Sequence, residues 1–180
     1  MNRFPVRMAL VMLVACSLTY GQTSKPEEAS AVISTAVKKA AATGRSVFLI
    51  FHASWCGWCT RLDAVLEQPD IKVIIDQHYV VAHLDVLENK AKKALENPGG
   101  NEVMKEYGGE NSGLPFYVFL GEEGTKLADS NALPKNQNIG YPASAEEIAA
   151  FAGLLKATAP RMSDEQRTQI TTYLQKNAPR

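Results

Sequence analysis

Along the chain, segments whose apolar residues recur at the spacing of an α-helix alternate with segments whose apolar pattern is typical of a β-strand. A segment with Pro26 near its start carries apolar residues every three to four positions, which predicts an amphipathic helix ended by Gly44. Residues 47–53 are almost continuously apolar, a pattern typical of a strand that is buried on both faces of a sheet. The apolar positions of the predicted helix are Ala29, Val32, Ile33, Ala36, Val37 and Ala40.

The middle of the chain predicts more helix and a second strand. We expect a helix from residue 56 to about residue 68, where Pro69 interrupts it, and then a further helical turn or two over residues 71–76. Residues 78–86 alternate between apolar and polar and predict a strand. Residues 87–100 are polar and lysine-rich, and they form either a loop or a short surface helix.

The rest of the chain predicts a short helix, two paired strands and two capped helices. In both capped helices a serine precedes a glutamate or glutamine by three positions, which is the pattern of a capping box. This order implies an α/β fold, with a central mixed β-sheet flanked by helices on both faces and an extra C-terminal helix. We expect one domain over residues 25–158 and a helical extension over residues 159–180. The predicted short helix spans residues 102–107, and the two paired strands span residues 116–120 and 125–128. The two predicted capping boxes are Ser144 with Glu147 and Ser163 with Gln166.

Composition does not indicate a charged partner. The 180 residues include 19 basic and 19 acidic side chains, and the basic ones are scattered. The chain is long enough for one domain with a substantial core, and we expect no binding of nucleic acid.

The N-terminal residues predict export. Arg3 and Arg7 precede an apolar run of the length found in secretory signal peptides, so residues 1–21 are predicted to be a signal peptide. Two endings stay open, because small residues near residue 20 suit ordinary cleavage, while the segment that ends at Cys16 resembles a bacterial lipobox. The expected location is the bacterial periplasm or envelope. Contact with the membrane is expected only if Cys16 is lipidated.

Two cysteines spaced C-x-x-C, Cys56 and Cys59, follow directly after the first predicted strand. If a helix begins at Cys56, its free N–H groups and its dipole favour a thiolate there, and Cys59 lies one turn away for disulfide formation. A zinc site lacks further ligands, because Cys16 lies in the predicted signal peptide and the histidines show no H-x3-5-H spacing. A purely structural disulfide would close too short a loop to stabilise the chain much. We therefore expect a redox pair that needs neither metal nor cofactor.

The element order, the sequence W-C-G-x-C after the first long strand and Gly113-Leu114-Pro115 before the strand pair resemble the thioredoxin family. The resemblance covers residues 27–156 and is greatest to exported thioredoxin-like proteins with a W-C-x-W-C motif. It implies that Cys56 is the exposed attacking cysteine, that Cys59 is the buried resolving cysteine, and that Pro115 is a cis-proline beside them.

The resemblance also implies a surface for protein clients. Its residues are Trp55, Gly57, Trp58, Leu114 and Pro115. The backbone at residues 114–115 would dock an extended client segment through strand-like hydrogen bonds. Both tryptophans would flank the sulfurs as contact surface; Trp55 serves in packing as an alternative or in addition, and we expect Trp58 to be the more exposed.

The chain departs from the family pattern at several positions. Trp58 stands where proline is common, Thr60 stands where lysine is typical, and Ile50 stands where thioredoxins carry a buried aspartate that accepts a proton from the resolving thiol. Asp63, one turn after Cys59, could substitute for that aspartate, although an exposed helix aspartate is the simpler interpretation. His52 either favours the Cys56 thiolate from the end of the strand or is simply packed there.

These features together predict an exported thiol–disulfide oxidoreductase that acts on protein thiols and disulfides. The W-C-G sequence favours reduction over oxidation, and a reductase outside the cytosol would need a membrane electron donor. The alternative is a thioredoxin-like binding module for envelope clients or partners without catalytic turnover. A third hypothesis is the handling of copper(I) by the two thiolates.

Overall fold

The computed structural model describes residues 25–178. The predicted signal peptide and Cys16 lie outside the described residues. The four strands are β1 (Ser46–His52), β2 (Tyr79–Asp85), β3 (Phe116–Leu120) and β4 (Lys126–Asp129), in the order β2-β1-β3-β4. β1 is parallel to β2 and antiparallel to β3, and β3 is antiparallel to β4, which confirms the predicted mixed sheet.

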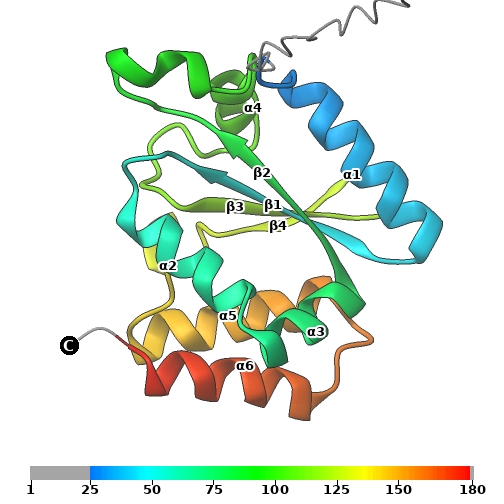
Figure 1. Ribbon diagram of the computed structural model, residues 1–180. Coiled ribbons are helices and arrows are strands. Elements are labelled where there is room, and N and C mark those ends of the chain that lie inside the picture. Colours follow the sequence, from blue (N-terminus) through cyan, green and yellow to red (C-terminus); the bar gives the residue numbers. More distant parts are fainter. Residues whose placement is uncertain (1–24, 179–180) are drawn as a thin grey trace, which may run out of the picture.

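Helices cover both faces of this sheet, as predicted (Figure 1). One face carries α1 (Ala29–Thr43) and α4 (Gly100–Glu106). α1 ends at Gly44, whose φ of 62° is a left-handed conformation that glycine adopts without strain. The apolar residues of β1 that face these helices are Val47, Leu49 and Phe51.

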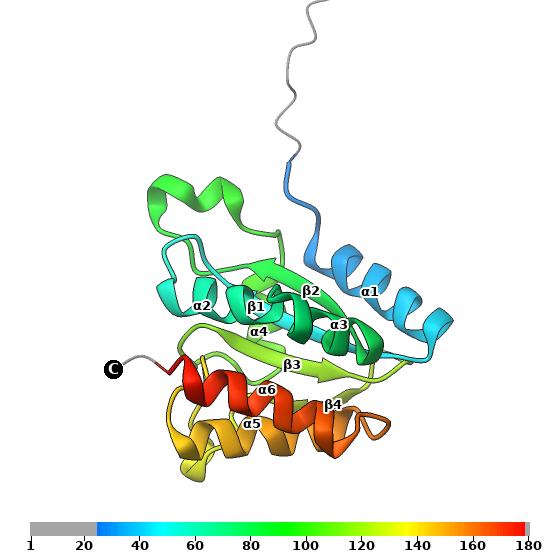
Figure 2. The ribbon, with the colours of Figure 1, turned by 60° about the horizontal axis from the view of Figure 1, so that its bottom comes forward.

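The opposite face carries four helices, and Figure 2 shows α5 and α6 on the far side of the sheet from α1. Phe48 of β1 lies in the core there, stacked on Phe119 with ring centroids 4.6 Å apart. Ile170 and Leu174 of the last helix are buried in the same core, so the predicted C-terminal helix packs against the sheet layer. The helices are α2 (Gly57–Leu66), α3 (Pro69–His78), α5 (Ala145–Thr158) and α6 (Asp164–Lys176).

Both predicted capping boxes are present. The side chain of Ser144 accepts a hydrogen bond from the Glu147 backbone, and the Glu147 carboxylate accepts one from the Ser144 backbone at 2.8 Å. Ser163 and Gln166 form the same reciprocal pair at the start of α6. These contacts satisfy backbone N–H groups that have no partner within the helix, which explains why both helices begin where the sequence indicates.

The structure corrects or completes the predicted secondary structure in three segments. Residues 71–76 belong to a full ten-residue helix, α3, because the Gln68 side chain caps its start and Pro69 occupies its first turn. Residues 90–95 form the 3-10 helix η1 (Lys90–Leu95) within the segment expected to be a loop or short helix. A second 3-10 turn, η2 (Pro134–Asn136), lies in the connection after β4. Within residues 25–178, no helix has the length and apolar character needed to cross a membrane.

The register of the sheet brings three chain segments together at one edge of the molecule. Phe51, near the end of β1, pairs with Phe116 at the start of β3. His52, the last residue of β1, pairs with Asp85 at the end of β2. The segments after β1, before β3 and after β2 therefore meet, and they contain the C-x-x-C motif, Pro115 and the residues around 88.

Candidate active site

Cys56 and Cys59 form a disulfide, with an S–S distance of 2.06 Å and Cα atoms 5.3 Å apart. Cys56 is the residue that caps α2, and its Sγ accepts a hydrogen bond from the Cys59 backbone N–H at 3.1 Å. Phe51 is fully buried near the end of β1 and so fixes the point at which the chain leaves the sheet. The helix α2 begins directly after Cys56. The sulfur of Cys56 thus lies where backbone N–H groups stabilise a thiolate.

Both cysteines are buried in this oxidised pair, with Cys56 4% and Cys59 2% exposed. Ala53 and Leu114 pack against them in a small apolar cluster. The expected contrast between an exposed Cys56 and a buried Cys59 is therefore small in the disulfide form. A thiolate that attacks this disulfide has to approach it past the surrounding side chains, because both sulfur-bearing residues are nearly inaccessible to solvent.

Leu114 packs against the disulfide, and the peptide bond between Leu114 and Pro115 is cis. Asn138, from the long connection after β4, donates hydrogen bonds to the carbonyl oxygens of Gly113 at 2.7 Å and Pro115 at 3.0 Å. Sequence reasoning missed Asn138, because the irregular connection in which it lies carries no periodic signal. Its side chain fixes the segment that faces the sulfurs.

The two tryptophans of the motif are both exposed, but the expected difference between them was wrong. Trp55 is 55% exposed and Trp58 is 48% exposed. Trp58 stacks on Tyr141 with ring centroids 5.7 Å apart, and the Arg61 guanidinium lies 5.4 Å from the Trp58 ring centroid. These two neighbours cover part of Trp58, whereas Trp55 is held mainly by a hydrogen bond from Nε1 to the Leu87 carbonyl oxygen at 2.9 Å.

Gly57, between the cysteines, has open space around it. A Cβ built at this position would meet nothing within 4 Å. The fold therefore does not require glycine here, and a role for Gly57 in client contact stays a prediction.

Glu88 anchors the turn that carries Ser54 and Trp55. This carboxylate is only 6% exposed, and it accepts hydrogen bonds from the Ser54 backbone at 2.5 Å and from the Ser54 hydroxyl at 3.0 Å. Lys92 donates to the same hydroxyl, and the Glu96 side chain accepts a hydrogen bond from the Glu88 backbone at 2.7 Å. The segment with η1 is thus fastened to the turn before Cys56. Sequence reasoning treated this segment only as a surface loop or short helix.

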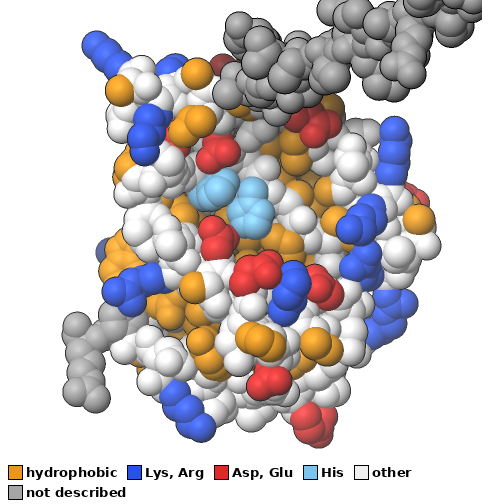
Figure 3. All heavy atoms as spheres, in the orientation of Figure 1, with side chains coloured by type: hydrophobic (Ala, Val, Ile, Leu, Met, Phe, Trp, Pro, Cys, Tyr) orange, Lys and Arg blue, Asp and Glu red, His pale blue; other side chains and the backbone are white. Residues whose placement is uncertain are grey.

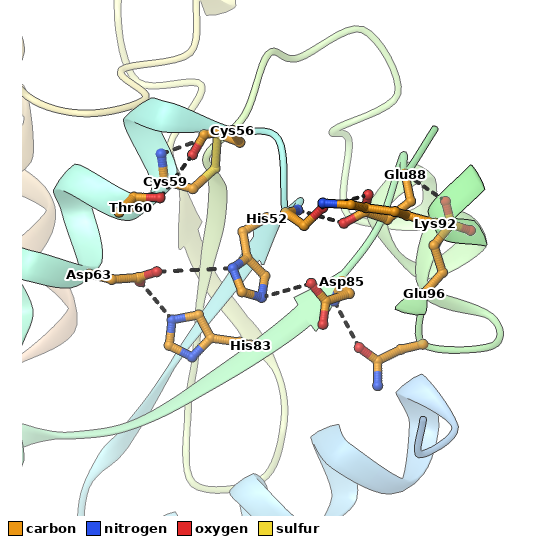
Figure 4. Close-up of polar contacts among 12 residues, drawn as sticks. His52, Cys56, Cys59, Thr60, Asp63, His83, Asp85, Glu88, Lys92 and Glu96 are labelled. Atoms are coloured by element: carbon orange, nitrogen blue, oxygen red, sulfur yellow. Dashed lines mark hydrogen bonds and ion pairs between the residues drawn. A yellow bond between two sulfur atoms is a disulfide. The ribbon is translucent and has the colours of Figure 1, made fainter. Parts of the chain in front are cut away.

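His52 lies at the end of β1 between two carboxylates, as Figure 4 shows. Its Nε2 is 3.3 Å from Asp85 Oδ1, and its Nδ1 is 4.0 Å from Asp63 Oδ2. Burial lowers the pKa of His52 below its usual 6.5, with a smaller contribution from His83, while Asp85 and Asp63 oppose this shift. The polar contacts of His52 run to these carboxylates rather than to the sulfur of Cys56.

Asp63 is not the freely exposed helix residue that the sequence suggested. Its side chain is 35% exposed, and Oδ1 is hydrogen-bonded to His83 Nε2 at 2.9 Å. The rings of His52 and His83 lie next to each other, with centroids 4.9 Å apart. We call His52, Asp63, His83 and Asp85 the histidine–aspartate cluster. Among residues 25–178, no group of three or more His, Cys, Asp or Glu side chains is arranged to hold a metal ion.

Comparison with known proteins is consistent with this geometry. A family model described as thioredoxin-like matches residues 28–121, just over half of the chain. Among curated relatives, a protein disulfide-isomerase from Hordeum vulgare is 24% identical over 130 residues, which are 71% of this chain and 23% of the relative. Protein disulfide isomerase-like 1-3 from Oryza sativa is 31% identical over 83 residues, or 45% of this chain and 15% of the relative. The chain therefore spans less than a quarter of these relatives.

Among solved structures, a disulphide isomerase from Xylella fastidiosa is similar in fold. The match has a TM-score of 0.50 at 20% sequence identity, and it covers 89% of this chain and 98% of that one. The similarity extends beyond the region that the family model matches, so the overall fold of the described chain has a precedent among disulphide isomerases.

Proposed function

Because the chain belongs to the thioredoxin-like family of disulfide oxidoreductases, we propose that it is an exported enzyme that exchanges disulfides with protein clients and preferentially reduces them. The observation that carries the proposal is the Cys56–Cys59 disulfide at the start of α2, with Leu114 and the cis Pro115 beside it. This combination supports the proposal, because a sulfur at a helix N-terminus is readily activated and the neighbouring backbone offers hydrogen-bonding groups to an extended client.

The proposed reaction proceeds in two exchanges. In the reduced enzyme, the Cys56 thiolate attacks one sulfur of a client disulfide, so that a mixed disulfide forms and the other client sulfur leaves as a thiolate. Cys59 then loses its proton and attacks Cys56. The Cys56–Cys59 bond forms, the second client sulfur leaves, and two electrons have passed from the enzyme to the client.

The surface around the sulfurs supports a protein client. Trp55 and Trp58 present large aromatic surfaces on the two sides of Cys56, and both are about half exposed. Aromatic side chains of this kind give contact area without demanding one client sequence. Continued turnover outside the cytosol would require a membrane electron donor, which we propose as the second partner. The predicted signal peptide supports this location.

An insulin-reduction assay tests the proposed activity. With dithiothreitol as electron donor, the wild type should accelerate the precipitation of insulin chains, and Cys56→Ser should fall to the uncatalysed rate because the attacking sulfur is lost. A wild type that gives no acceleration would instead support the binding-module alternative. That alternative retains the exposed tryptophans but needs no turnover.

A further inference from the structure

The resolving exchange requires a proton acceptor for Cys59, and the surroundings of this residue limit the choice. Cys59 is 2% exposed and packs against Ala53 and Leu114, so bulk water has little access to its thiol. Apolar burial raises the pKa of a thiol and so opposes formation of the attacking thiolate. On the face of β1 that looks toward α2, Ile50 is fully buried and cannot accept a proton.

The histidine–aspartate cluster is connected to Cys59 through the helix α2. Asp63 is four residues after Cys59 within α2, so the two side chains lie on the same side of the helix on successive turns, with Cβ atoms about 5–6 Å apart. His52 is on the same face of β1 as Ile50 but two residues nearer to Cys56, and it reaches Asp63 from the strand (Figure 4).

The hydrogen bonds of the cluster leave an acceptor ready for a proton. In the tautomer with its proton on Nε2, which lies 3.3 Å from Asp85 Oδ1, His52 carries a lone pair on Nδ1, 4.0 Å from Asp63 Oδ2. His83 donates from Nε2 to the other oxygen of Asp63 at 2.9 Å and holds that carboxylate in place. His52 Nδ1 and Asp63 Oδ2 can each accept a proton, and their separation of 4.0 Å is longer than a hydrogen bond.

The cluster also has a route to solvent. Figure 3 shows histidine side chains in a hollow of the surface with acidic side chains around it. This hollow has a volume of about 340 Å³, and His52, Asp63 and His83 line it. A proton received on the inner side of the cluster can therefore be released to water on the outer side. The other titratable groups that face the cluster are Glu67, Lys72, Asp76 and Glu88.

We propose that Asp63 and His52, positioned by His83, accept the proton of the Cys59 thiol in the resolving exchange. The S–H bond of Cys59 breaks, its electron pair forms the bond to Cys56, and the bond between Cys56 and the client sulfur breaks. The client leaves as a thiolate, while the proton remains on the cluster until water removes it. The inference rests on the proposed function, because it concerns the second step of that reaction.

The lifetime of the mixed disulfide tests this proposal. Reduced enzyme is mixed with a peptide that contains one disulfide, the reaction is stopped with acid at intervals, and the mixed disulfide is measured by mass spectrometry from pH 5 to pH 10. Asp63→Asn and His52→Gln remove the acceptors with little change of shape. Asp70→Asn, an exposed aspartate in the first turn of α3, is the matched control.

In the wild type, the resolution rate should be level above pH 7 and should fall as the pH drops through the lowered pKa of His52, because the protonated cluster accepts no further proton. Asp63→Asn should lengthen the lifetime at pH 7 by at least about ten-fold, within the range of general-base catalysis. In this variant the rate should rise with pH up to the range of a free thiol, near pH 8.5 or above, and there the curves should converge. The rate of the first exchange should be unchanged in every variant.

The proposal would be overturned if the mixed disulfide had the same lifetime as in the wild type at all pH values in both Asp63→Asn and His52→Gln. If Asp63→Asn does not fold, as judged by circular dichroism, His83→Gln gives the decision, since loss of the positioning hydrogen bond should lengthen the lifetime and shift the same pH profile. Failure of the wild type itself to form any mixed disulfide is a different result, because it would remove the proposed function and the proton acceptor with it.

Discussion

The Cys59→Ser variant is expected to stop after the first exchange and to accumulate a covalent complex with its client. Cys56 keeps its position at the start of α2, where the helix N-terminus stabilises its thiolate, so attack on a client disulfide should continue. The serine hydroxyl cannot displace the client from Cys56. The complex should therefore persist for minutes to hours, about the time scale of uncatalysed disulfide rearrangement.

Mass spectrometry of the alkylated reaction mixture measures this complex directly. With a peptide disulfide as client, one peptide should be found on Cys56, and addition of dithiothreitol should release it. Cys56→Ser is the matched control and should carry no peptide, because Cys59 lies inside α2 and not at the helix N-terminus that stabilises a thiolate. A peptide attached to Cys59 in that control would contradict the assigned order of attack.

The Glu88→Ala variant is expected to lower the free energy of unfolding by about 1–3 kcal/mol, which is the usual cost of leaving buried hydrogen-bonding groups without their charged partner. Glu88 is 6% exposed and holds both the backbone and the hydroxyl of Ser54, two residues before Cys56. Urea unfolding measures the loss of stability. Hydrogen exchange at the Ser54 amide should become faster than in the wild type, because that N–H loses its acceptor.

Glu122→Ala provides the control for this effect. Glu122 is an exposed glutamate in the turn between β3 and β4, on a part of the chain far from Ser54 in sequence. Its removal should change the free energy of unfolding by less than about 0.5 kcal/mol. Equal losses of stability in the two variants would mean that Glu88 does not anchor the turn before the motif.

Much of the fold could be predicted because local patterns and tertiary structure agree. The apolar run at residues 47–53 became the central strand β1, since only a strand covered on both faces can bury five consecutive apolar side chains. Ser144 and Ser163 marked the starts of α5 and α6, because capping boxes are local hydrogen-bond patterns. The length of α3 was underestimated, because Pro69 alone indicated only a break in the preceding helix. In the structure, the side chain of Gln68 caps a new helix there.

The redox pair could be predicted from spacing, but its surroundings could not. Cys56 and Cys59 are close in sequence, so one motif shows them both. The contact between Asp63 and His83 depends on how α2 lies over β2, and neither residue has a local signal for it. The greater exposure of Trp55 has the same origin, because Tyr141, which covers Trp58, comes from a distant loop.

The reduction potential of the Cys56–Cys59 pair is the most direct test of the account's central claim, that this disulfide is the redox centre of a client-reducing enzyme. The pair is equilibrated with dithiothreitol and glutathione buffers of defined potential, and the oxidised fraction is measured by alkylation and mass spectrometry. The account predicts a value near that of thioredoxin, about −270 mV. A value near about −120 mV, which is that of a strong oxidant, would contradict it.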